Sequence, residues 1–186
     1  MIFITETELK GLFVAQQELF SDHRGYFMER FRLDLWEEAV GPFRVIQENE
    51  SFSFKGVVRG LHYQLSPYGQ SKLVWVVRGA VRDVVVDMRP DSPTFGHHFV
   101  GELSDQNKTQ LFIPKGFAHG FLVLSPEAVV QYMVDAHYVP EAERCLRFDD
   151  PQLGIDWGVP PDSCRLSEKD RQGLSWEAAM IEIVKR

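Results

Sequence analysis

The chain has 186 residues, of which 44% are hydrophobic and 25% are charged, a composition typical of a folded domain and unlike that of a disordered chain. We therefore expect residues 1–186 to form a single domain with its own core. The formal net charge of -7 argues against a nucleic-acid-binding protein, because binding to the phosphate backbone depends on clustered Lys and Arg.

The start of the chain and its cysteines predict the compartment. Residues 1–6 lack the basic and long apolar regions of a secretory signal, and no stretch approaches the ~18 apolar residues of a membrane span. Cys145 and Cys164 show neither metal-ligand spacing nor a disulfide framework. We expect a cytoplasmic protein that does not enter a membrane. The apolar residues 1–4 are consistent with a strand added to another chain's sheet edge.

Gly and Pro divide the chain into short β-prone runs, a pattern that favours an all-β fold. The predicted strands are residues 45–52, 57–64, 72–77, 80–87, 97–103, 110–113, 119–124 and 129–134. The turn at Arg78 and Gly79 predicts a hairpin between two of them. Residues 33–40, stopped by Gly41 and Pro42, and residues 175–184 are predicted to form helices outside the β-structure.

Two segments, residues 56–64 and 114–120, resemble the two cupin motifs in their spacing. This resemblance implies an antiparallel jelly-roll barrel with short flanking helices. Gln64 stands where a metal-binding cupin has His, and Lys72 stands where an acidic ligand is usual. Because an ammonium group has no lone pair for a metal, we expect no metal and no cofactor. His62 and the Lys72 cation suit proton abstraction beside a carbonyl whose enolate is stabilised.

The rest of the chain is similar to one cupin family, the dTDP-4-dehydrorhamnose 3,5-epimerases. The resemblance is carried by residues 22–29, 47–49, 58–64, 69–74, 91–96, 114–120 and 166–170, with Tyr132 and Tyr138. It implies an isomerase whose dTDP-sugar substrate is a 6-deoxy-4-keto-hexose. The C4 carbonyl acidifies the hydrogens at both C3 and C5, so one base can serve both carbons. The family acts in dTDP-rhamnose biosynthesis for cell-surface polysaccharide.

The resemblance also implies four catalytic residues. His62 is the base, and Asp170 orients its imidazole and stabilises the protonated form. Lys72 stabilises the enolate charge near the C4 oxygen. Tyr132 delivers a proton to the opposite face, as its phenol is acidic enough for a basic enolate.

Each of these residues also has a purely structural interpretation. His62 and Tyr132 can be hydrogen-bonded core residues, and Lys72 can be a strand-end lysine that reaches water. Strand alternation nevertheless places Tyr132 on the face of Val130 and Val134, which points inward. Lys72 shares an apolar face with Val74 and Val76. Asp170 can instead belong to a helix cap, since Ser167 precedes it by three residues.

The substrate-binding residues that the resemblance implies are mostly polar. They are Arg24, Glu29, Gln47, Asn49, Arg59, His119, Tyr138, Glu143 and Lys169. Each can also be an ordinary surface or turn residue. Tyr138 is expected to stack on the thymine ring, and His119 to line the sugar pocket. The family forms homodimers, in which Arg24 and Glu29 come from the partner chain.

Arg59 poses a geometric problem, because it and His62 have opposite strand parity and are expected on opposite faces. A bulge at Gly60 would reconcile them.

Several functions remain open at this stage. The first is the double epimerisation, and close alternatives are an epimerase of C3 or C5 alone or a ketoisomerase. A metal-dependent cupin oxygenase and a non-catalytic sugar-binding barrel belong to other classes. Retention of an acid and a base together argues against simple binding.

Overall fold

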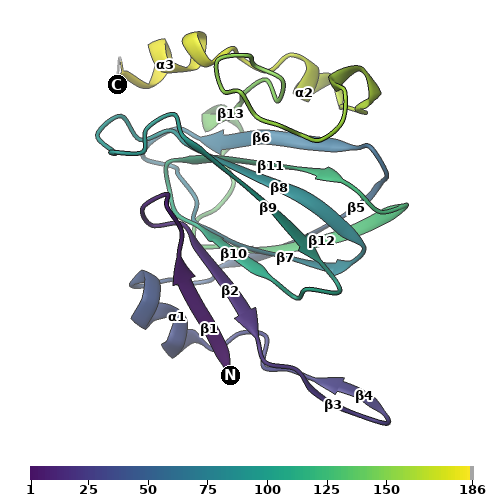
Figure 1. Cartoon of the computed structure of the whole chain (residues 1–186). Coiled ribbons are helices and arrows are strands. Elements are labelled where there is room, and N and C mark those ends of the chain that lie inside the picture. Colours follow the sequence, from purple (N-terminus) through teal and green to yellow (C-terminus); the bar gives the residue numbers. More distant parts are fainter. Residues whose placement is uncertain (185–186) are drawn as a thin grey trace.

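The computed structural model describes residues 1–184 and contains two main antiparallel sheets. One has the order β1 (Ile2–Glu6), β2 (Phe13–Gln17), β10 (Gln110–Ile113), β7 (Lys72–Arg78), β12 (Glu127–Val134), β5 (Gln47–Phe54). The other has the order β13 (Glu143–Cys145), β6 (Val58–Gln64), β11 (Phe117–Val123), β8 (Ala80–Asp87), β9 (His98–Ser104). A small hairpin of β3 (Phe20–Asp22) and β4 (Gly25–Phe27) projects away from both sheets (Figure 1).

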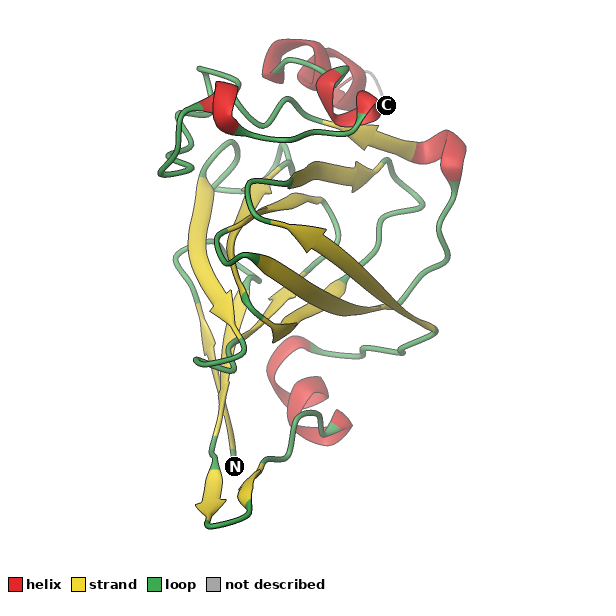
Figure 2. Ribbon diagram, turned by 90° about the vertical axis from the view of Figure 1, so that its right-hand side faces the viewer, coloured by secondary structure: helices red, strands yellow, loops and turns green. Residues whose placement is uncertain are grey.

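The helices lie outside the sheets (Figure 2). They are α1 (Leu33–Val40), α2 (Glu168–Arg171) and α3 (Trp176–Val184), with short 3-10 helices η1 (Pro140–Ala142) and η2 (Pro161–Ser163). Gly41 ends α1 with a φ of 79° and donates its N–H to the Glu37 carbonyl at 3.0 Å. That conformation suits glycine, which explains why the helix stops where the sequence predicts.

Three apolar clusters hold these layers together. The main core lies between the sheets and includes Val74, Val85 and Val130, while a second cluster joins the five-stranded sheet to the C-terminal helices. A third places Trp36 of α1 against Phe112 of the six-stranded sheet. Because β8 is covered on both faces, it is almost entirely buried. The layers form the predicted cupin-type jelly roll with short flanking helices.

The eight predicted strands are present, most of them with ends shifted by one or two residues. The prediction of a hairpin at Arg78 and Gly79 is wrong, since β7 and β8 belong to different sheets. Gly79 instead carries the chain from one sheet to the other with a φ of 81°. A Cβ there would lie 2.2 Å from the Glu127 carbonyl oxygen, so only glycine fits the crossing.

Five strands were not among those predicted, namely β1 to β4 and β13. β1 pairs with β2 of its own chain at the edge of the six-stranded sheet. Within this chain, residues 2–6 thus pair with β2. Pairing of residues 1–4 with a second chain stays a prediction.

The predicted irregularity at Gly60 is confirmed. His119 pairs with His62 and Phe121 pairs with Arg59, so two residues of β6 face one residue of β11. Gly60 has a φ of 121°, and a Cβ on it would lie 2.6 Å from the Gly120 Cα. The bulge changes the side-chain alternation between Arg59 and His62.

Candidate active site

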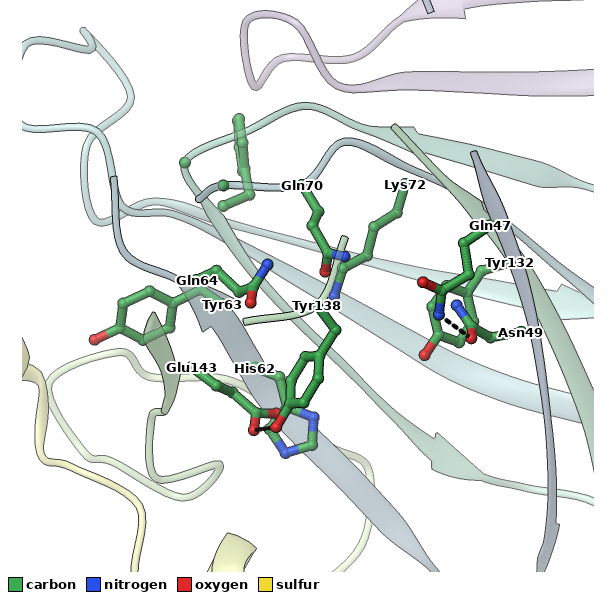
Figure 3. Close-up of a pocket in the computed structure, with 13 residues that line it drawn as sticks. Gln47, Asn49, His62, Tyr63, Gln64, Gln70, Lys72, Tyr132, Tyr138 and Glu143 are labelled. Carbon is green, nitrogen blue, oxygen red and sulfur yellow. Dashed lines mark hydrogen bonds between the residues drawn. The ribbon is translucent and has the colours of Figure 1, made fainter. Parts of the chain in front are cut away.

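A pocket of about 290 Å³ lies between the two sheets (Figure 3). The six-stranded sheet contributes Gln47, Asn49, Lys72 and Tyr132, and the five-stranded sheet contributes His62, Tyr63, Gln64, Phe117 and Glu143. Gly69, Gln70, Gly116 and Tyr138 complete the lining. The pocket thus joins the predicted catalytic side chains His62, Lys72 and Tyr132, which come from three different strands.

The His62 imidazole is held by Asp170. Its Nε2 lies 2.5 Å from Asp170 Oδ1, and the Asp170 side chain is only 5% exposed. Burial opposes ionisation of Asp170, but the hydrogen bonds from His62 and Ser167 outweigh it and hold the pKa of the carboxyl below its usual value. An ionised carboxylate only accepts, so Nε2 carries the proton and Nδ1 is left with the lone pair. The pair can therefore orient a general base.

The same carboxylate also belongs to a helix cap. Ser167 Oγ accepts the Asp170 backbone N–H at 3.1 Å and donates to Asp170 Oδ2 at 2.8 Å. The two interpretations of Asp170 are thus compatible, because its two oxygens serve different partners.

Lys72 extends from β7 into the space between His62 and Tyr132 (Figure 3). Val74 and Val76 on the same face are buried in the main core, as strand alternation predicts. Desolvation lowers the pKa of Lys72 to about 8, although the charges of Asp83 and Glu143 favour the ammonium form. The residue is a cation at neutral pH that is enclosed by protein and can face a developing negative charge.

Tyr132 lies on the other side of the pocket from His62 (Figure 3). Its ring packs on the main core, and Lys72 Nζ lies 6.0 Å from the ring centroid. Desolvation raises the pKa of Tyr132 in spite of the Arg59 charge, so the phenol keeps its proton at neutral pH. A proton donor and a proton acceptor therefore face one space from opposite walls.

A cluster of polar groups forms the rim of the pocket. The Tyr138 hydroxyl and Lys169 Nζ both donate to Glu143 Oε2, and Tyr138 is 48% exposed. Burial opposes ionisation of Glu143, but the bonds from Lys169 and Tyr138 lower its pKa. An aromatic face is thereby fixed at the mouth of the pocket, where a base can stack on it.

Of the other predicted binding residues, two line the pocket and one lines a depression next to it. Gln47 and Asn49 line it, and Gln47 Nε2 donates to Asn49 Oδ1 at 2.7 Å. Arg59 lines a neighbouring depression together with Lys169, and His62 lines both this depression and the main pocket. Arg59 Nε also donates to Ser53 Oγ at 2.8 Å.

His119 is a buried residue of β11 in the five-stranded sheet, and its Nε2 lies 2.9 Å from Asp83 Oδ2. It does not line the pocket, although its backbone pairs with that of His62. Sequence reasoning missed Asp83, because an acidic residue inside an apolar strand signals a partner but does not say which one.

Arg24 and Glu29 are not brought to the pocket of their own chain. Arg24 lies in the projecting β3–β4 hairpin and pairs with Asp22, with side-chain exposure of 78% (Figure 1). Glu29 lies 3.9 Å from Arg32 Nη1 at the base of the same hairpin. Neither residue is among those that line the pocket.

Gln64, the replacement for a metal-binding His, has structural partners. Its Nε2 donates to the Tyr68 carbonyl at 2.8 Å, and its Oε1 accepts the Val139 N–H at 2.7 Å. The amide therefore fixes two loops at the rim.

Comparison with known proteins identifies the family. The family model described as dTDP-4-dehydrorhamnose 3,5-epimerase matches residues 6–178. The chain belongs to this family. A dTDP-4-dehydrorhamnose 3,5-epimerase from Shigella flexneri is 47% identical over 171 residues, covering 91% of this chain and 93% of the relative. A dTDP-4-dehydrorhamnose 3-epimerase from Streptomyces niveus is 40% identical over 167 residues, covering 89% and 80%.

A solved structure of a related epimerase has the same fold as this chain. The Legionella pneumophila dTDP-6-deoxy-D-glucose-3,5-epimerase, in complex with dTDP-4-keto-L-rhamnose, superposes with a TM-score of 0.92. It is 43% identical, and the match covers 98% of this chain and 97% of that chain. The protein is thus an isomerase of the dTDP-sugar epimerase family. Within residues 1–184, no helix is long and apolar enough to cross a membrane.

Proposed function

We propose that this family member epimerises C3 and C5 of dTDP-4-dehydro-6-deoxy-D-glucose and so forms dTDP-4-dehydro-L-rhamnose. The observation that carries the proposal is the placement of the His62–Asp170 pair and Tyr132 on opposite walls of one pocket, with Lys72 between them. A base and an acid on opposite faces of a sugar ring suit inversion, because removal and return of the proton then occur on different sides.

The reaction needs two proton transfers at each centre. His62 Nδ1 removes the proton beside the C4 carbonyl, and Asp170 stabilises the resulting imidazolium. The C4 oxygen becomes an enolate, whose charge Lys72 stabilises by about 3 kcal/mol for one well-placed donor. Tyr132 then gives its proton to the carbon from the other face, and the same groups act at the second centre after exchange with solvent. No cofactor enters this sequence of steps.

The size of the pocket supports a particular orientation of the substrate. At about 290 Å³, it lies at the lower end of small-molecule sites and suits the sugar better than a whole nucleotide sugar. We therefore place the keto-sugar among His62, Lys72 and Tyr132 and the thymine on the exposed face of Tyr138. Arg59 and Lys169 supply charge near the diphosphate, with Gln47, Asn49, Glu143 and His119 supporting the pocket.

The rest of the nucleotide site belongs to a homodimer in this proposal. Arg24 and Glu29 lie on or beside a hairpin that extends away from its own barrel, and Phe20 and Phe27 on that hairpin are 52% and 70% exposed. A partner barrel that receives the hairpin would cover this apolar surface, and the Arg24 cation would then lie in the nucleotide site of that partner. The same proposal places the enzyme in the cytoplasm, where its free Cys145 and Cys164 stay reduced.

A 3-epimerase is the second candidate, because the Streptomyces niveus relative carries that name. Proton NMR of the product formed in deuterated water separates the two functions. Double epimerisation predicts deuterium and inverted configuration at both C3 and C5. Label and inversion confined to C3 would favour the second candidate, and absence of exchange at both carbons would overturn the proposed chemistry.

A further inference from the structure

A thiol lies directly beside the proposed base. Cys145 on β13 pairs in register with His62 on β6, and Asp170 on α2 approaches both. Cys145 Sγ is 3.6 Å from Asp170 Oδ1, and His62 Nε2 is 2.5 Å from the same oxygen. One sulfur, one nitrogen and one oxygen ligand therefore lie within 4.8 Å of one another. The catalytic steps given above make no use of this sulfur.

The donor set suits a borderline-soft divalent cation such as Zn²⁺. Tetrahedral zinc with one sulfur ligand and one oxygen ligand separates these atoms by about 3.5 Å, close to the existing distance from Cys145 to Asp170. Zinc needs about 3.3 Å between nitrogen and oxygen and about 3.5 Å between nitrogen and sulfur, whereas the nitrogen lies 2.5 Å from the oxygen and within 4.8 Å of the sulfur. The nitrogen must therefore move by about 1 Å, away from the oxygen and toward the sulfur. His62 has that freedom, since within residues 1–184 its side chain hydrogen-bonds Asp170 alone.

The surroundings also favour a defined site. Ser167 Oγ holds the other Asp170 oxygen at 2.8 Å, the kind of outer contact that orients a ligating carboxylate. Cys145 and Asp170 are 8% and 5% exposed, whereas the His62 side chain is 28% exposed to the pocket. A cation can therefore enter from the His62 side and keep a fourth position for water, as three-ligand zinc sites do.

We propose that Cys145, His62 and Asp170 form a site for Zn²⁺ and chemically similar thiophilic cations, and that occupation of this site switches the epimerase off. Binding releases the Cys145 thiol proton to solvent and forms a sulfur–metal bond. The metal binds the lone pair of His62 Nε2, so the Nε2 proton leaves to solvent, and the neutral ring takes up one proton from solvent on Nδ1, the nitrogen that acts as the base. The loss of activity rests on the proposed function, whereas the binding does not.

The test uses Co²⁺ as a spectroscopic probe and Zn²⁺ as the inhibitor. Co²⁺ bound to the thiolate gives a sulfur-to-metal charge-transfer absorption band, which added Zn²⁺ should abolish at one equivalent. Cys145→Ser should lose the band, while Cys164→Ser, whose thiol is not part of the cluster, should keep it. Inhibition by zinc is measured as a fraction of each variant's own zinc-free rate. The zinc concentration that gives half inhibition should rise tenfold or more in Cys145→Ser and should stay unchanged in Cys164→Ser.

A second variant keeps the test decisive if Cys145→Ser does not fold. Asp170→Asn keeps the thiol and should weaken cobalt binding at least tenfold, measured by absorbance without any turnover. A cobalt band that survives Cys145→Ser, or that Cys164→Ser removes, would overturn the site. So would the absence of a band at excess cobalt. Cobalt binding by a protein that has no epimerase activity even when it is free of metal would instead refute the proposed function and leave the site intact.

Discussion

Replacement of Lys72 by methionine should make the protein more stable and nearly inactive. Desolvation lowers the Lys72 pKa from 10.5 to about 8, so the folded state holds this proton less tightly than the unfolded state. Each pKa unit corresponds to about 1.4 kcal/mol, which puts the cost of the buried ammonium at about 3 kcal/mol below pH 8. Methionine keeps the length and apolar stem without the charge, so unfolding free energy should rise by about 1–3 kcal/mol.

The pH dependence of stability provides an independent check. Because the folded pKa is the lower one, the unfolded state binds more protons between pH 8 and 10.5, and wild-type stability should rise with pH across that window. The advantage of Lys72→Met should be complete below pH 8 and shrink toward zero above pH 10.5. Thermal unfolding measures both effects, with a gain of about 2–4 °C per kcal/mol for a protein of this size.

Activity should change in the opposite direction. Loss of one well-placed group facing the enolate should reduce kcat/KM by about 10²–10³-fold. Wild-type kcat/KM should itself decline as pH rises through about 8, where Lys72 loses its proton. Lys55→Met, at an exposed position, is the matched control and should change neither property. A Lys72→Met variant that is less stable than wild type, or that keeps a third of its activity, would refute the reasoning.

Four further outcomes are expected. His62→Ala should reduce deuterium entry at both C3 and C5 by about a hundredfold or more in NMR assays, whereas residual exchange at one carbon would require a second base. Tyr132→Phe should allow exchange with retained configuration and slow inversion sharply, so normal inversion would point to water as the acid. Asp170→Asn should cut kcat steeply with little loss of melting temperature. Ser167→Ala should lower the unfolding free energy by about 1 kcal/mol and the rate by less than tenfold. An Asp170→Asn variant that is active but less stable would make Asp170 chiefly a cap. Turnover should survive exhaustive chelation, and activity restored only by added metal would contradict the roles given to Gln64 and Lys72.

Local rules predict much of the fold because they act on neighbouring residues. Alternation along β12 places Tyr132 with the buried Val130 and Val134, and alternation along β7 turns Lys72 inward beside Val74. The period of two is a property of the extended backbone, so it does not depend on what the strand pairs with.

Pairings between distant segments do not follow from such rules. A short turn between two β-prone runs favours a hairpin, yet at Gly79 the chain leaves one sheet for the other, because β7 pairs with β10 and β12. The partnership of His119 with Asp83 has the same character, since strand pairing 36 residues apart creates it. The Cys145 thiol reaches His62 through a pairing of β13 with β6 that no spacing between cysteines encodes.

Asp170 shows why two interpretations of one residue need not compete. A carboxylate has two oxygens with about four acceptor sites, enough for both a cap and a catalytic partner. In α2, Oδ2 receives the Ser167 hydroxyl while Oδ1 faces His62 Nε2. The cap restricts rotation of the carboxylate, and that restriction aims the second oxygen at the imidazole. The helix start is therefore the device that positions the base, and the reaction rate depends on the orientation that it gives to the Asp170 side chain.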